Sequence, residues 1–190
     1  MANVVQVAWA RYLRQLEREP LKTKAITSGS LAALSDITAQ KLVSNAPLNW
    51  RRTLAMALFG LIWSGPSNHY WQKFTNQLFK GKKDAASVVQ KVLIDNLVYS
   101  PVFNLLVMAY IATVVEGRSM SFVQTKLQRD FPSLQLDSWK LWPLVSLINY
   151  KYVPLKLRVL VMQAIAFFWQ TFLILRAKSA VVQRVPLKTA

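Results

Sequence analysis

The chain has 190 residues, of which 53% are hydrophobic, and 24 Lys and Arg against 8 Asp and Glu give it a net charge of +16. It is too apolar for an ordinary soluble domain and too charged for a chain that lies wholly in lipid, so several membrane spans joined by basic loops fit its composition. The absence of cysteine and the single histidine exclude disulfides, a cysteine nucleophile and Cys- or His-rich metal sites.

Residues 3–18 are predicted to form an amphipathic helix, because apolar and basic residues alternate there at helical spacing. Trp9 and Leu13 fall on one face, and Arg11 and Arg14 fall on the other. A helix of this kind can lie on a membrane surface with its basic face toward the headgroups. It can equally pack its apolar face on the rest of the protein, and the sequence leaves both possibilities open.

Two membrane spans are predicted next, at about 21–43 and 51–79. The first is only weakly apolar, but it is rich in small residues that allow close helix packing in lipid. It also contains Asp36, which is costly inside a span unless it faces a partner or water. In the second span, the Ser-Gly-Pro sequence at 64–66 is expected to kink or break the helix.

The third span is predicted at about 86–115, after the clearest loop of the chain at 80–84. This loop is strongly basic, and its Lys80, Lys82 and Lys83 are the expected targeting determinant. The alternative is that these lysines only form a solvated loop.

The segment 119–154 is interpreted as an amphipathic or interfacial loop. Pro132 is expected to end a short surface helix in its first half. The apolar stretch at 139–150 is too short to span a membrane, which is typical of a re-entrant or interfacial segment. The last span is predicted at about 155–177, and a basic tail follows at 178–190.

These elements predict an all-α fold, a polytopic integral membrane helical bundle that forms a single domain over residues 1–190. The bundle has four transmembrane helices, an N-terminal amphipathic helix and a short interfacial or re-entrant helix before the last span. The last span is the clearest, because residues 159–175 carry no charge. Four spans place both termini on one side, and the distribution of Lys and Arg favours the cytosol for that side.

The partner expected for the basic residues is the lipid bilayer and not a nucleic acid. Lys and Arg flank the apolar runs, as they do beside anionic headgroups, and they do not interleave with exposed aromatic residues.

Polar residues inside the predicted spans are the candidate functional residues. Three helices with one polar stripe each could line a hydrated pathway. The same groups could instead hydrogen-bond one another and hold a closed bundle together. The candidates are Asp36, Gln40, Asp95, Asn96, Ser100, Asn104, Gln163 and Gln170.

Catalysis is not expected of this chain. His69 is the one candidate general base, and no nucleophile or metal partner accompanies it in the sequence. We therefore expect no catalytic, cofactor-binding or metal-binding residue.

A series of short motifs follows the chain in a fixed order, from a Gly-x-Leu sequence ahead of Asp36 to a Trp-x-x-Trp-Pro sequence at 139–143. The residues of these motifs are Gly65, Pro66, His69, Trp71, Trp139, Trp142, Pro143, Asn149, Pro154, Arg158 and Trp169. Their order resembles the Mpv-type family of small peroxisomal and mitochondrial inner-membrane proteins, which includes the 22 kDa peroxisomal membrane protein. The resemblance covers nearly the whole chain, and Ser35, Asn96 and Ser146 depart from the residues usual in the family.

The resemblance implies an integral protein of the peroxisomal membrane, with the mitochondrial inner membrane as the alternative. It also implies a role in non-selective permeability to small solutes. The competing hypothesis is a non-catalytic protein that organises membrane assembly through its small-residue faces and basic loops. The expected partners are the lipid bilayer, the import machinery for peroxisomal membrane proteins and a second copy of the chain.

Overall fold

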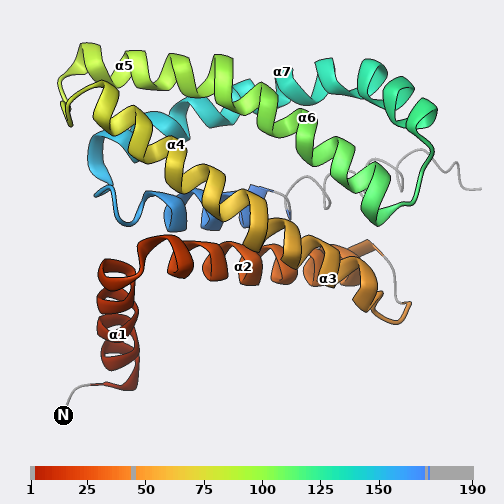
Figure 1. Ribbon diagram of the computed structural model, residues 1–190, viewed down its shortest axis with the longest axis horizontal. Coiled ribbons are helices and arrows are strands. Elements are labelled where there is room, and N and C mark those ends of the chain that lie inside the picture. The colour runs from red at the N-terminus through yellow and green to blue at the C-terminus, as the bar shows by residue number, and fades with distance from the viewer. Residues whose placement is uncertain (1–2, 44–45, 170, 172–190) are drawn as a thin grey trace, which may run out of the picture.

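The structure, a computed structural model, describes residues 3–43, 46–169 and 171 (Figure 1). These residues form helices and the turns that join them, and no β-strand occurs among them. The all-α prediction is therefore confirmed. The elements are α1 (Val4–Arg18), α2 (Pro20–Val43), α3 (Trp50–Phe59), η1 (Gly60–Ser64), α4 (Gly65–Leu78), α5 (Ala85–Ile94), η2 (Asp95–Tyr99), α6 (Ser100–Tyr110), η3 (Ile111–Val115), α7 (Met120–Tyr152) and a C-terminal helix (Arg158–Trp169).

α1 stands at a steep angle to α2 at one end of the bundle (Figure 1). It begins at a capping box on Asn3, which satisfies backbone N–H groups that the first turn leaves free. Its C-terminal half packs on the bundle, since Leu16 is buried and the Tyr12 hydroxyl lies 3.2 Å from Thr27 Oγ1. Its N-terminal half leaves Trp9 exposed. The apolar face is thus covered in one half of the helix and uncovered in the other.

The second helical run, 50–78, is continuous, so the break expected at its Gly-Pro sequence does not occur. In its place η1 forms one wide π-helical turn, in which the Gly65 N–H donates to the Gly60 carbonyl oxygen five residues back. Pro66 follows this turn directly and falls in the first turn of α4, where its missing N–H costs least. The wide turn therefore absorbs the proline without ending the helix.

The third run, Ala85–Val115, repeats this device at Pro101. In η2 the Ser100 N–H donates to the Asp95 carbonyl oxygen, again five residues back and just before the proline. The run has 31 residues, and in the described part of the chain it is the one helix long and apolar enough to cross a membrane by itself. Its observed bounds agree with the predicted span.

α7 joins the short helix and the short apolar segment expected within 119–154 into one element, so the helix end expected at Pro132 is wrong. It is one helix of 33 residues, with Pro132 and Pro143 inside it. A proline removes one backbone hydrogen bond and strains the preceding turn, but side-chain contacts on both sides of it can outweigh that cost. Here α7 is held along its length by α5 and α6, as the hydrogen bonds of the polar interior show below.

The C-terminal helix begins at Arg158, three residues later than the predicted start of the last span. The Leu157 N–H donates to the Pro154 carbonyl oxygen at 2.9 Å, so residues 154–157 form a tight turn before the helix. The helix is described to Trp169, and the rest of the predicted span lies outside the described residues apart from Thr171.

α7 runs antiparallel to the third run over its whole length (Figure 1). Lys126 near its start pairs with Glu116 at the end of the third run. Ser146 near its end bonds Asp95, which lies ten residues into the run. The next turn returns to the first end of the bundle, where Lys156 Nζ lies 2.6 Å from Glu17 Oε1 of α1. The C-terminal helix therefore starts at the end of the bundle where α2 starts.

α2 and the second run pack most closely of all, because glycines bring their backbones together. A Cβ atom at Gly60 would stand 2.6 Å from the Ser28 carbonyl oxygen, and one at Gly65 would stand 2.7 Å from Ala25 Cα. Both contacts are with backbone atoms that have no freedom to move aside. This is the small-residue packing expected of α2 from its sequence.

Candidate functional site: the polar interior of the bundle

The buried residues of the described chain are mostly polar or charged, while many large apolar side chains are exposed. Soluble proteins show the opposite preference, because burying apolar area in place of polar groups drives their folding. An apolar exterior with a polar interior is the arrangement expected where the surroundings are lipid. The candidate site is therefore the interior, and its polar groups gather at several helix junctions.

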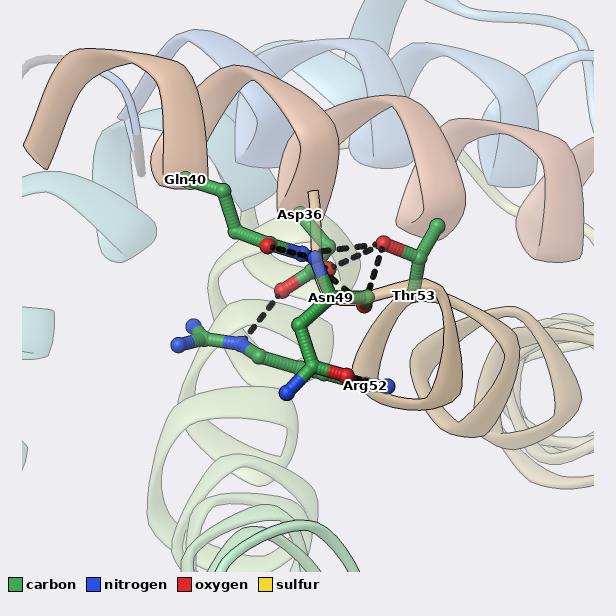
Figure 2. Close-up of polar contacts among 5 residues, drawn as sticks. All are labelled: Asp36, Gln40, Asn49, Arg52 and Thr53. Atoms are coloured by element: carbon green, nitrogen blue, oxygen red, sulfur yellow. Dashed lines mark hydrogen bonds and ion pairs between the residues drawn. The ribbon is translucent and has the colours of Figure 1, made fainter. Parts of the chain in front are cut away.

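The first junction joins α2 to α3 around Asp36, which is 4% exposed (Figure 2). One carboxylate oxygen accepts a hydrogen bond from Arg52 Nε at 2.7 Å. The other accepts from Thr53 Oγ1 at 2.7 Å and from Gln40 Nε2 at 2.6 Å. Gln40 Oε1 in turn accepts from the Asn49 N–H at 2.7 Å. Both oxygens of Asp36 are thus bound by neighbouring side chains, and the group fixes the reversal between the two helices.

The second junction joins three helices at Asp95, which is 6% exposed. Its Oδ1 accepts from Trp71 Nε1 of α4 at 2.7 Å and from the Tyr150 hydroxyl of α7 at 3.3 Å. Its Oδ2 accepts from the Ser146 hydroxyl at 2.5 Å. One carboxylate in η2 therefore holds α4 and α7 together.

A third set of contacts binds α6 to the middle of α7. Asn104 Nδ2 donates to Gln135 Oε1 at 3.0 Å and to Ser138 Oγ at 3.3 Å. Gln135 Nε2 donates to Ser100 Oγ at 3.5 Å. The sequence indicated Asn104 and Ser100 but missed their partners on α7, because 119–154 was interpreted as a surface segment. The spacing of Gln135 and Ser138, on one face of a helix that continues past Pro132, is the signal that could have found them.

The remaining candidates lie apart from these junctions. Asn96 Nδ2 donates to the Val92 carbonyl oxygen of its own helix, and its backbone oxygen accepts from Trp139 Nε1 at 2.9 Å. Gln163 Nε2 of the C-terminal helix donates to Ser64 Oγ at 2.8 Å. Gln170 lies outside the described residues.

The motif residues mostly serve these contacts between helices. Trp71 and Trp139 donate their indole N–H groups, and Gly65 permits the close approach of α2 and α4. His69 Nδ1 lies 3.2 Å from Lys24 Nζ. Asn149 is 1% exposed beside the C-terminal end of α7.

The other motif residues have simpler places. Pro66 begins α4, Pro143 lies inside α7 and Pro154 opens the turn that follows it. Trp142 and Trp169 are half-buried. Arg158 is 1% exposed and covers the C-terminal end of α7, where its Nε donates to the Val153 carbonyl oxygen at 3.1 Å.

Two buried lysines were missed by the sequence reasoning. Lys24 is 4% exposed and Lys91 is fully buried, although lysine is almost never fully buried without a partner. Lys91 Nζ, from α5, donates to the Lys82 carbonyl oxygen and so holds the basic loop 80–84 in place. The loop ends at Asp84, whose carboxylate accepts from the Ser87 N–H at 3.0 Å and caps α5; these hydrogen bonds lower the pKa of Asp84.

No group of three or more His, Asp and Glu side chains that could hold a metal ion occurs in the described residues.

The role of Asp95 in holding the helices together can be tested by its effect on thermal stability. Replacing Asp95 by Ala leaves the donors of Trp71, Ser146 and Tyr150 without their acceptor, at a cost of about 3 kcal/mol in total. The unfolding midpoint of the detergent-purified protein should fall by about 10 °C. Asp130→Asn, which alters an exposed carboxylate paired with Arg129, is the control and should leave the midpoint nearly unchanged. Equal midpoints for the two variants would contradict the junction.

Comparison with known proteins places the chain among membrane proteins. The profile of the Mpv17 / PMP22 family matches residues 113–174. Peroxisomal membrane protein PMP22 of Arabidopsis thaliana is 42% identical over 169 residues, which are 89% of this chain and 89% of that protein. PXMP2/4 family protein 3 of Dictyostelium discoideum is 37% identical over 85% of this chain and 86% of its own.

A mitochondrial relative is also similar. The mitochondrial inner membrane protein Mpv17 of Bos taurus is 35% identical over 87% of this chain and 94% of its own. No solved structure matches the chain significantly. The names of these relatives confirm the predicted localisation, the peroxisomal membrane with the mitochondrial inner membrane as its alternative. Since the similarity extends over most of both chains, the protein belongs to the Mpv17 / PMP22 family.

Proposed function

We propose that the protein crosses the peroxisomal membrane several times and contributes to the passive permeability of that membrane to small solutes. The observation that carries the proposal is the reversed burial pattern, with polar groups inside and large apolar side chains outside. In lipid this pattern satisfies the buried polar groups and leaves the apolar surface in contact with acyl chains. We propose that these interior polar groups border the route taken by water and small polar solutes.

The four predicted spans remain part of this proposal, although one helix alone passes a hydropathy test in the described residues. α2 shows why such a test underestimates the others. Its Ser28 and Asp36 are buried, while Ile26 and Leu34 are 51% and 48% exposed. Averaging over the whole helix mixes a polar inner face with an apolar outer face, so the mean falls below that of a membrane helix.

α7 adds a fifth passage along the bundle to the predicted four. Because α7 follows the third run antiparallel from end to end, it returns the chain to the side from which that run started. Its Leu144 and Ile148 are exposed, so α7 also presents apolar side chains on its outer surface. Asp137 and Lys140 are also exposed, and their ion pair at three-residue spacing lowers the cost of placing both charges near lipid.

The interior also contains buried polar atoms that lack a hydrogen-bond partner among the described residues. They belong to several helices: Ser28 Oγ in α2, Gln72 Oε1 in α4, Asn96 Oδ1 in η2 and both amide atoms of Asn149 in α7. Each such atom costs about 1–3 kcal/mol when it is dry, and water in a hydrated pathway would remove that cost. We propose that the pathway passes these groups, while Asp36 and Asp95 hold the helices around it.

A second candidate function is the organisation of membrane assembly through contacts with other proteins. The basic loop favours it, because Lys80 and Gly81 have positive φ angles of 48° and 70° that form a fixed turn with exposed lysine side chains. We propose that this loop is recognised by the import machinery for peroxisomal membrane proteins. Neither candidate function requires a catalytic residue.

The permeability proposal predicts that the purified protein in liposomes speeds the release of small neutral solutes. Gln72→Leu should reduce this release several-fold, because it replaces a polar interior group by an apolar one of similar size. Gln77→Leu is the matched control, since Gln77 is exposed on the same helix. Correctly folded protein that releases no solute would overturn the proposal.

The passage of α7 through the membrane predicts which loops share a side, and the cysteine-free chain allows single cysteines to report it. Lys156→Cys and Lys83→Cys should react with an impermeant maleimide from one side of the membrane, and Arg118→Cys from the other. An interfacial segment at 119–154 predicts instead that positions 156 and 118 react from the same side. Labelling of intact and permeabilised peroxisomes distinguishes the two arrangements.

The targeting proposal predicts that a fluorescent fusion carrying Lys80→Glu, Lys82→Glu and Lys83→Glu no longer co-localises with peroxisomal markers. Mitochondrial markers should be imaged beside them, because the family includes mitochondrial members. Lys22→Glu, at another exposed lysine, should leave the localisation unchanged. Normal localisation of the triple variant would show that the loop is only a solvated turn.

A further inference from the structure

Three buried cationic side chains have no carboxylate partner in the described part of the chain. Lys24, Lys91 and Arg158 are at most 4% exposed. Burying an unpaired charge costs several kcal/mol, so such a group normally has a counterion nearby. No acidic side chain of the chain supplies that counterion here, as a survey of all of them shows.

All eight acidic side chains of the chain lie in described residues, and each has other contacts. None of them is within ion-pairing distance of the three buried cations. The acids and their contacts are Glu17 with Lys156, Glu19 with Lys22, Asp36 with Arg52, Asp84 with Ser87, Asp95 with Trp71, Glu116 with Lys126, Asp130 with Arg129 and Asp137 with Lys140.

Lys91 is accounted for by the structure around it. Its Nζ binds the Lys82 carbonyl oxygen just after the end of α4, and it lies 5.6 Å from the centre of the Phe79 ring. A carbonyl and an aromatic face both stabilise a cation. Lys91 therefore has a structural role in holding the basic loop.

Arg158 and Lys24 are accounted for only in part. Arg158 Nε and Nη2 donate to the Val153 and Tyr150 carbonyl oxygens at 3.1 Å each, and the guanidinium lies over the Tyr150 ring. Its Nη1 is buried and has no hydrogen-bond partner among the residues that the structure describes. Lys24 Nζ lies within hydrogen-bonding distance of His69 Nδ1, which is an imidazole nitrogen and not a carboxylate. Both cations lie against α4, because His69 of α4 contacts Lys24, and the Tyr150 ring under Arg158 is joined through Asp95 to Trp71 of α4.

Asn149 completes this group. It precedes Tyr150, whose carbonyl oxygen binds Arg158, and it is 1% exposed. Within residues 3–43, 46–169 and 171, neither atom of its side-chain amide has a hydrogen-bond partner. An amide N–H and a guanidinium N–H in the same region, both unpaired, are donors suited to an oxyanion.

We propose that Lys24, Asn149 and Arg158 form a binding site for a small carboxylate anion, at the end of the bundle where α7 turns into the C-terminal helix. Water could accept the same hydrogen bonds but would leave two like charges without a counterion in one buried region. A carboxylate supplies the acceptors and the counterion as well. The inference deepens the proposed permeability, since it gives the pathway a preference for anionic solutes.

The test is a thermal-unfolding titration of the full chain in detergent, with sodium acetate replacing sodium chloride at constant ionic strength. Acetate should raise the midpoint by about 4 °C at ten times its dissociation constant, and the neutral isostere acetamide should not. Lys24→Gln should lose most of this rise. Lys22→Gln, at an exposed lysine two residues away on α2, should keep it.

A second variant distinguishes the loss of the site from a loss of folding. Asn149→Leu removes an amide that makes no hydrogen bond, so it should fold at least as well as the native chain and still lose the response to acetate. An equal response to acetate in Lys24→Gln and Lys22→Gln, or in Asn149→Leu and the native chain, would overturn the site.

The binding experiment is independent of the proposed permeability because it needs no membrane. Protein that binds acetate but releases no solute from liposomes contradicts the permeability and keeps the site. Protein that releases neutral solutes but shows no response to acetate contradicts the site and keeps the permeability.

Discussion

The fold depends on hydrogen bonds to buried carboxylates, and above all on those to Asp95. This side chain receives donors from α4 and from two turns of α7. In a bundle with an apolar exterior, apolar contacts cannot hold the helices together as they do in water, because lipid offers the same contacts. Polar contacts and close packing must hold them, and a carboxylate that accepts from two other helices joins three elements at one point.

The packing of α2 against the second run supplies the other requirement. Gly60 and Gly65 remove side chains where the two backbones meet, and the contact distances leave no room for a methyl group. Close approach of this kind increases van der Waals contact along the helices. The Asp36 junction then fixes the far end of the same pair, so the two devices act together over the length of α2.

The polar groups of the interior are of two kinds, those with hydrogen-bond partners and those without. Asp36 and Asp95 have their oxygens occupied and hold helices together. Gln72 and Asn149 are equally buried but have unpaired atoms. A group that is already satisfied contributes to stability, whereas an unsatisfied one carries a cost that water or a ligand can remove. The unpaired amides and the buried Arg158 are therefore better candidates for contact with a solute than the carboxylates are.

The sequence by itself determined the class of fold and the family. Helical spacing and hydropathy depend on neighbouring residues, so they located the third run. The course of α7 and the continuity past Pro66 and Pro132 were decided by the tertiary structure, because contacts from α5 and α6 and a π-helical turn outweigh the local preference of proline. The missing counterion of Arg158 was likewise visible only in three dimensions. Charge balance in a buried region depends on which side chains are neighbours in space, and the sequence shows only how many of each sign the chain contains.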